Sequence, residues 1–72
     1  MRLGKFLSDL TKPELEELEG LLNLTEEQAA IFNLLSKGKS NMYICEKCSL
    51  SSTSLDIRIR VIKDKIKRLG WC

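Results

Sequence analysis

Basic side chains that could bind phosphate are concentrated in the second half of this 72-residue chain. Residues 37–72 contain nine basic and three acidic residues, whereas residues 1–36 contain three basic and seven acidic ones. Neutralisation of phosphate groups by lysine and arginine supplies most of the sequence-independent affinity of proteins for nucleic acids. An ordinary solvated basic surface has the same composition. Charge alone therefore leaves nucleic-acid binding and a plain helix surface as equal alternatives.

The three cysteines are the other residues with chemical potential. Cys45 and Cys48 have the spacing of half a zinc knuckle, and Cys72 could supply a third thiolate, but no histidine or second cysteine pair completes the site. In a helix Cys45 and Cys48 share one face, and cysteine is among the most buried residue types. We expect both to pack in the core, Cys72 to be exposed and oxidisable, and no metal or other cofactor to bind. A metal site and a redox role are the minor alternatives.

The residues give little support to catalysis. Because the chain lacks histidine, general acid–base chemistry would require a carboxylate or a lysine with a shifted pKa. The serines over residues 49–54 have no evident activating base and are typical of turns and helix caps. The sequence therefore predicts a protein that is not an enzyme.

Two helices are predicted near the N-terminus. Apolar residues recur at helical spacing over Arg2–Leu10, which predicts a short first helix. Thr11 and Glu14 can form a capping box with Pro13 in the first turn, so a second helix begins there, and Asn23 ends it. The apolar stripe of this second helix consists of Leu15, Leu18, Leu21 and Leu22.

Two more helices follow. Thr25 and Gln28 can form a second capping box, which precedes a broad apolar stripe. Gly38 is a suitable left-handed stop after that stripe. Ser40 can then cap a short helix over residues 41–48.

The last predicted helix begins after Ser51 or Ser52, either of which can cap it, and ends at Gly70. Residues 56–61 alternate in polarity and include β-branched side chains, so a strand is the alternative there. Helix is favoured by an apolar face with spacings of four and three residues, which comprises Leu55, Ile59, Ile62, Ile66 and Leu69.

The break between these last two helices spans only residues 48–51, which is too short for anything but a tight turn. Two helices joined in this way form a helix-turn-helix unit, whose second helix enters the DNA major groove. We therefore expect an all-α fold with a helix-turn-helix three-helix core over residues 24–69. One or two extra N-terminal helices over residues 1–23 would pack on that core, and residues 70–72 would form a tail.

Several short motifs lie in a characteristic order. They are Leu24-Thr25-Glu26-Glu27-Gln28, Lys37-Gly38-Lys39-Ser40-Asn41, Ile44-Cys45, Leu50-Ser51-Ser52-Thr53-Ser54-Leu55, Ile62 and Lys65-Ile66. In this register, residues 24–69 resemble the GerE/LuxR-type helix-turn-helix domain and the related sigma-factor domain that reads the −35 promoter element. The sequence departs from the family pattern at Cys48, where leucine is usual, and at Asp56, where lysine is common.

The resemblance implies a small DNA-binding regulator of transcription, of bacterial or phage type, that binds double-stranded DNA. The helix over residues 41–48 would brace the last helix, and the DNA backbone would be touched by Lys39, Ser40 and Asn41. The last helix would direct outward Ser52, Thr53, Asp56, Ile57, Arg60 and Lys63. Helical spacing also places in one sector, roughly 120° from the apolar face, Thr53, Asp56, Arg60, Lys63 and Lys67.

Individual roles follow from side-chain chemistry. We expect Arg60 to make a bidentate contact with guanine. Asp56 would either accept from cytosine N4 or orient Arg60 one turn further on, and Thr53 and Ile57 could touch a thymine methyl group. Phosphate contacts are expected from Lys39, Lys63 and Lys67. For each charged residue the alternative is a solvated helix surface.

A second function is left open by the sequence. Ile57 and Val61 point away from the apolar stripe, so either the N-terminal helices pack on them or they form a partner surface. A partner surface would suit a helical protein-interaction module that keeps the helix-turn-helix fold without reading DNA. Helix-turn-helix proteins commonly bind paired half-sites as dimers. A homodimer could form through the N-terminal helices or through the C-terminal end with Trp71, and the sequence does not choose between them.

The sequence also bears on location. No apolar run reaches the roughly 18 residues that a membrane span requires. Residues 1–7 lack the apolar stretch of a signal peptide. We expect a cytoplasmic protein without membrane contact.

Overall fold

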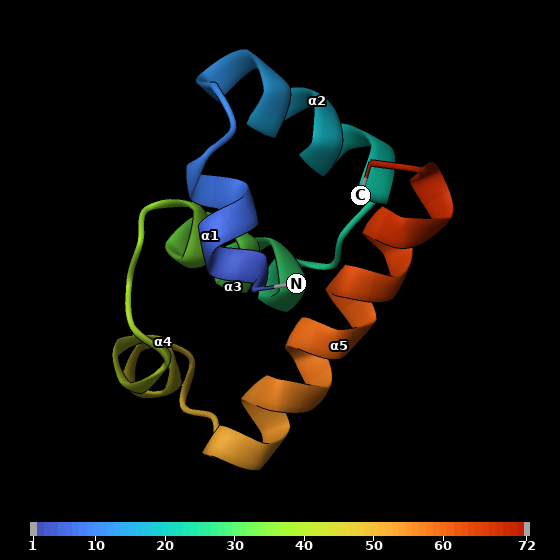
Figure 1. Cartoon of the computed structure of the whole chain (residues 1–72). Helices are drawn as coiled ribbons and strands as arrows, with labels where there is room; N and C mark the ends of the chain where they lie inside the picture. The colour runs from blue at the N-terminus through green and yellow to red at the C-terminus, as the bar shows by residue number, and fades with distance from the viewer. Residues whose placement is uncertain (1, 72) are drawn as a thin grey trace.

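A computed structural model describes residues 2–71 of the chain. Within this range the elements are α1 (Leu3–Ser8), α2 (Lys12–Leu22), α3 (Glu26–Ser36), α4 (Asn41–Cys48) and α5 (Ser52–Leu69) (Figure 1). The described residues contain no strand, so the extended alternative for residues 56–61 is wrong and the all-α prediction is confirmed.

Helices α2 and α3 begin at the two predicted capping boxes. The Thr11 N–H donates to Glu14 Oε1 at 2.9 Å, and the Glu14 N–H donates to Thr11 Oγ1 at 3.4 Å. Thr25 and Gln28 make the equivalent pair of hydrogen bonds, both at 3.3 Å. Each box satisfies N–H groups that have no partner inside the helix. The starts of both helices are therefore fixed by local sequence.

Serine hydroxyls cap the next two helices. Ser40 and Ser51 each accept the backbone N–H of the residue three positions later, at 3.2 Å in both cases. The cap of α5 is thus Ser51, one of the two serines that the sequence offers. Left-handed backbone follows four of the helices, at Asn23, Gly38, Ser49 and Gly70. The predicted ends at Asn23, Gly38 and Gly70 are confirmed.

The first helix is shorter than predicted. The expected range was Arg2–Leu10, whereas α1 covers Leu3–Ser8. Arg2 has an extended backbone and precedes the helix, and Asp9 follows it as the C-cap. Apolar periodicity does not show where a helix ends. Leu10 fits the periodic pattern because it packs against the core, although it lies beyond the end of α1.

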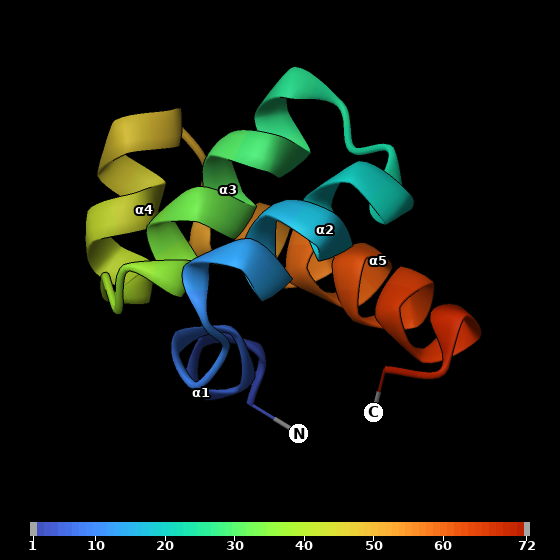
Figure 2. The same ribbon diagram turned by 90° about the horizontal axis from the view of Figure 1, so that it is seen from above.

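Helices α3, α4 and α5 pack against one another and form the helix-turn-helix core, with residues 49–51 as the turn. Figure 1 looks along the axis of α4 while α5 runs across the view, so these two helices cross steeply. The extra helix α1 packs on α3, and α2 contacts α3 and α5. Figure 2 shows α1 on the flank of α3, apart from α2 (Figure 2). All five helices therefore surround one core.

Every helix contributes side chains to that core. The buried residues are Leu3, Leu7, Leu18, Leu22, Ile31, Phe32, Leu35, Ile44, Leu55, Ile62 and Ile66. Two expected members are wrong, since Leu21 is 51% exposed and Leu69 is 41% exposed. Leu21 lies about 100° around its helix from Leu22, beyond the buried stripe. At the end of α5, Trp71 rather than Leu69 packs against the core.

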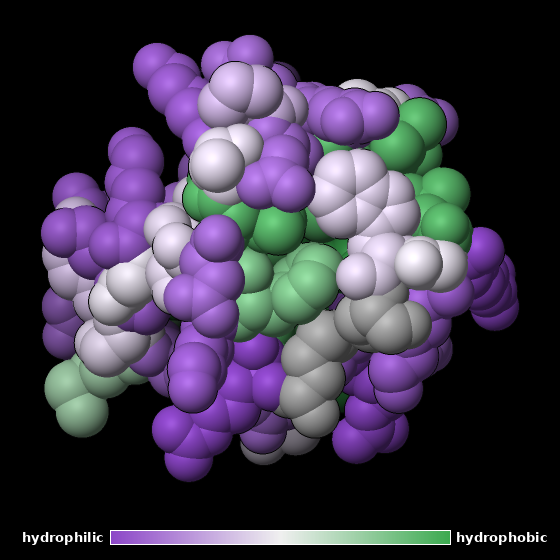
Figure 3. Space-filling view, turned by 45° about the horizontal axis from the view of Figure 1, so that its top comes forward, coloured by the Kyte–Doolittle hydropathy of each residue, from purple (hydrophilic) through white to green (hydrophobic). Residues whose placement is uncertain are grey.

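Some apolar surface remains visible on the outside. Figure 3 shows hydrophobic side chains in the middle of one face, with polar side chains around them (Figure 3). Half-buried residues that pack against the core include Phe6, Leu10 and Trp71. In the part of the chain that is described, every helix is too short or too polar to cross a bilayer.

The two sides of α5 should respond very differently to truncation. Ile62 is fully buried, at 0% exposure, so Ile62→Ala should lower the free energy of unfolding by about 2–5 kcal/mol. Ile57→Ala on the same helix is the matched control, because Ile57 is 51% exposed, and its effect should stay within about 0.5 kcal/mol. Urea unfolding followed by circular dichroism measures both variants. Equal losses would contradict this orientation of α5.

The capping box of α2 should make stability depend on pH. Hydrogen bonds from the Thr11 backbone N–H, and then from its hydroxyl, lower the pKa of the Glu14 carboxyl from the ordinary value of 4.5. A carboxyl with a lower pKa in the folded state stabilises the fold above its unfolded-state pKa. That contribution disappears as the pH falls through the folded-state pKa.

Glu14→Gln keeps an acceptor for the Thr11 N–H but cannot titrate. We expect it to lose less stability than the unmodified protein between about pH 5 and pH 2, as measured by urea midpoints. Glu16→Gln is the control, since Glu16 is exposed on the same helix and makes no side-chain hydrogen bond within residues 2–71. Identical acid profiles for all three proteins would refute the role of Glu14.

Candidate nucleic-acid interface

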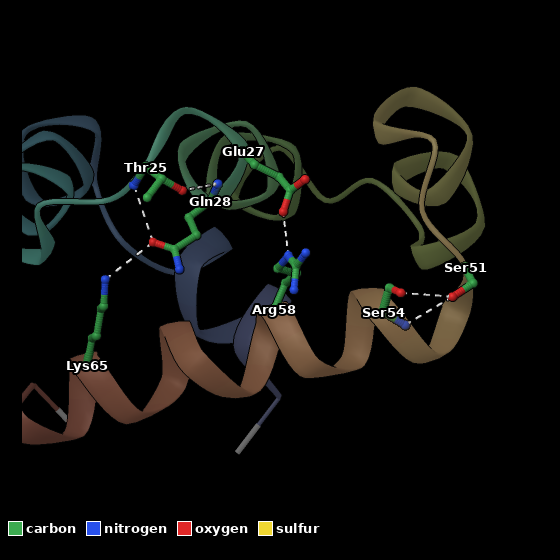
Figure 4. A network of polar contacts seen from close by, with 7 residues as sticks. All are labelled: Thr25, Glu27, Gln28, Ser51, Ser54, Arg58 and Lys65. Atoms are coloured by element: carbon green, nitrogen blue, oxygen red, sulfur yellow. Dashed lines mark hydrogen bonds and ion pairs between the residues drawn. The ribbon is translucent and has the colours of Figure 1, made fainter.

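The basic residues of α5 fall into two groups that point in different directions. Arg58 forms an ion pair through Nε with Glu27, and Lys65 Nζ donates to Gln28 Oε1 at 3.3 Å. Both partners lie in the first turn of α3, as Figure 4 shows (Figure 4). These two cations are therefore turned back toward the core. They add a polar link between α3 and α5, and these contacts engage the two cations within the molecule.

The other group lies on the outward side of α5. Exposed side chains on this side include the predicted Ser52, Thr53, Asp56, Ile57, Arg60 and Lys67, together with Val61, Asp64 and Arg68, and Lys63 is half-buried. The buried stripe of the helix lies on the opposite side. A helix with one apolar side and one exposed basic side has the amphipathic form that groove insertion requires. All of the sequence-predicted residues of α5 are thus accessible, with Lys63 the least so.

The turn before α4 adds a second group of polar side chains. Lys39, Ser40 and Asn41 are all exposed at the start of this helix. Lys39 Nζ lies 5.1 Å from the centre of the Tyr43 ring, and Lys47 Nζ lies 5.7 Å from the same ring. These distances suit cation–π attraction, which orients the two ammonium groups over the ring. The sequence reasoning did not single out Tyr43 or Lys47, because their pairing depends on helical side-chain direction.

A surface hollow joins the turn to α5. Its lining residues come from α1, from the turn between α3 and α4, and from the edge of α5 that adjoins the core at Ile59. Half of the predicted interface residues line it: Lys39, Ser40, Asn41, Asp56 and Lys63. The remaining five lie on α5 outside the hollow: Ser52, Thr53, Ile57, Arg60 and Lys67. The structure thus brings one half together and places the other half on the adjoining helix surface.

Two basic residues of this hollow were missed by the sequence reasoning. Arg2 and Lys5 line it from the side of α1. Residues 2–8 contain two basic and no acidic side chains. When charges are summed over residues 1–36, the glutamates of α2 outweigh Arg2 and Lys5, so this half of the chain looks acidic. A shorter counting window would have separated them, although only the fold shows which surface they join.

Asp56 does not act as expected toward Arg60. Within residues 2–71 the ion pair that forms joins Arg58 to Glu27, and Asp56 makes none with Arg60. The interpretation that Asp56 orients Arg60 is therefore not supported. Asp56 instead lies among the basic residues of the hollow, where it reduces their summed positive charge. Its expected contact with cytosine stays a prediction.

The cysteines of α4 pack against the core. Cys45 and Cys48 are half-buried free thiols that pack against the core, as predicted from their spacing. The described part of the chain contains no cluster of three histidine, cysteine or acidic residues that could hold a metal ion. The expectation of an exposed Cys72 falls outside the described residues.

Neither a family model, nor a curated protein, nor a solved structure matches the chain significantly. The resemblance to GerE/LuxR-type domains therefore rests on the sequence motifs, and it enters the functional argument as a hypothesis.

Proposed function

We propose that this chain is a small helix-turn-helix DNA-binding protein that regulates transcription and reads the major groove with α5. The proposal places it in the cytoplasm of a bacterium or among phage-type regulators, with double-stranded DNA as its partner. Binding as a homodimer, through the N-terminal helices or the C-terminal end, belongs to the same proposal. No catalytic role is included.

The observation that best supports this proposal is the division of the basic residues of α5. Arg58 and Lys65 are engaged with α3, whereas Arg60 and Lys67 extend outward beside Thr53 and Ile57. The rotation of α5 about its buried stripe produces this division, and it leaves Arg60 and Lys67 accessible to a ligand. An exposed basic side on the second helix of a helix-turn-helix unit is what groove reading requires.

The second candidate is a helical protein-interaction module that keeps this fold without binding DNA. Ile57 is 51% exposed and Val61 is 37% exposed, and they lie one turn apart on α5. Two aliphatic side chains so placed suit an apolar partner surface. A thymine methyl group can account for Ile57 alone, so Val61 is the residue that favours this candidate.

Salt dependence separates the two candidates. If the protein binds DNA, the logarithm of its affinity for a mixed-sequence duplex should fall linearly with the logarithm of salt concentration, by about 0.9 per phosphate contact. Fluorescence anisotropy of a labelled duplex between about 50 and 200 mM salt measures this slope. Absence of salt-dependent binding would reject the DNA-binding proposal and favour the interaction module.

Arg60 should contribute specificity, and Arg58 should not. On a duplex selected from a random library for tight binding, Arg60→Ala should weaken binding by about 1–3 kcal/mol, the range for a lost bidentate base contact. Arg58→Ala removes the same side-chain type from the same helix, but from the side that faces Glu27. Its affinity should stay close to that of the unmodified protein. Equal losses in the two variants would show that Arg60 has no special contact with a base.

A further inference from the structure

The hollow beside α5 is bordered on one side by α1, a helix outside the helix-turn-helix unit. Its basic side chains come from three separate elements, and they are Arg2, Lys5, Lys39 and Lys63. Asp56 is the acidic residue among those that line it. The hollow therefore carries a clear excess of positive charge, while the whole chain carries only +2.

Helix α1 is firmly held in this position. Its apolar side chains Leu3 and Leu7 are 3% and 0% exposed and belong to the common core, and α1 packs on α3. The Phe6 side chain also packs against that core. Arg2 and Lys5 are left on the exposed side. Because the leucines anchor α1, its backbone does not have to be ordered when Arg2 and Lys5 bind a ligand.

The cations of the hollow make no ion pair with a carboxylate in the described residues, where the ion pair that forms joins Arg58 to Glu27. Like charges that face one another are unfavourable until an anion lies between them. The hollow is continuous with the outward side of α5 through Asp56 and Lys63. An extended polyanion could therefore contact α1, the turn and α5 together.

We propose that α1 is part of the DNA-binding surface, where Arg2 and Lys5 contact the phosphate backbone beside the groove that α5 enters. This inference rests on the proposed function, because it assumes that α5 meets double-stranded DNA. It extends the interface beyond the helix-turn-helix unit to a helix at the other end of the sequence. The contacts would be with phosphates, so they would add affinity without reading sequence.

The test compares two double variants that each remove one arginine and one lysine. Arg2→Ala with Lys5→Ala removes the α1 cations, whereas Arg58→Ala with Lys12→Ala removes two exposed or ion-paired cations that do not line the hollow. The measurement is anisotropy of a labelled mixed-sequence duplex across a salt series, with circular dichroism to verify equal helix content. Loss of two phosphate contacts should reduce the salt slope by about 1.8 and weaken binding at about 50 mM salt by more than tenfold.

Each outcome bears on the inference in a defined way. A salt slope that is reduced only in the Arg2→Ala, Lys5→Ala variant supports the inference. Binding as tight as that of the unmodified protein in Arg2→Lys with Lys5→Arg adds support, because that variant keeps both charges. Equal behaviour of the two Ala variants overturns it and leaves the proposed function standing. Tighter binding by the α1 variant also overturns it, since α1 would then shield the surface. If the unmodified protein binds no duplex, or prefers single-stranded RNA, both the inference and the proposed function fail.

Discussion

Burial of one apolar side of α5 is the constraint on which the rest of the molecule depends. Leu55, Ile62 and Ile66 lie in the same core as the buried residues of α3, and an 18-residue helix has only a few such positions to fix its rotation. Each residue turns the helix by about 100°. If the buried stripe were shifted by one residue along the sequence, α5 would rotate by about 100°. Arg60 would then leave the outward side, and other cations would take its place. The buried stripe thus decides that Arg58 and Lys65 meet α3 while Arg60 and Lys67 face solvent.

The turn between α4 and α5 supplies the second constraint, because it fixes where α4 lies relative to the exposed side of α5. Ser49 adopts a left-handed backbone with φ of 54°, and the Leu50 N–H donates to the Cys45 carbonyl at 3.0 Å. A non-glycine residue in this region costs roughly 1–2 kcal/mol. The closing hydrogen bond and the Ser51 cap, worth about 1 kcal/mol, offset much of that cost. Two helices are thereby joined by three residues without a glycine.

Local features of the fold could be predicted from the sequence, and features that depend on tertiary packing could not. Caps such as those at Thr11, Thr25 and Ser40 involve residues three positions apart, so the sequence alone contains both partners. The burial of Leu21 and Leu69 was wrongly predicted because periodicity cannot tell where neighbouring helices stop covering a stripe. The outward residues of α5 were predicted from the same periodicity. The position of Arg2 and Lys5 at the hollow could not be predicted, because it depends on the packing of α1 on α3, which no short-range pattern encodes.

The low net charge of the chain does not weigh against a polyanionic partner once the charges are placed in space. The acidic residues of the first half lie largely on α2, which Figure 1 shows at the opposite end of the molecule from α4. The Cα atoms extend over 29 × 22 × 20 Å, while electrostatic interactions are screened over about 8 Å at physiological ionic strength. A phosphate backbone that contacts Lys39 and Lys63 would therefore experience the nearby cations far more strongly than the distant glutamates. The relevant charges are those close to the surface that the phosphates contact, and the residues that line the hollow beside α5 include four basic residues and one acidic residue.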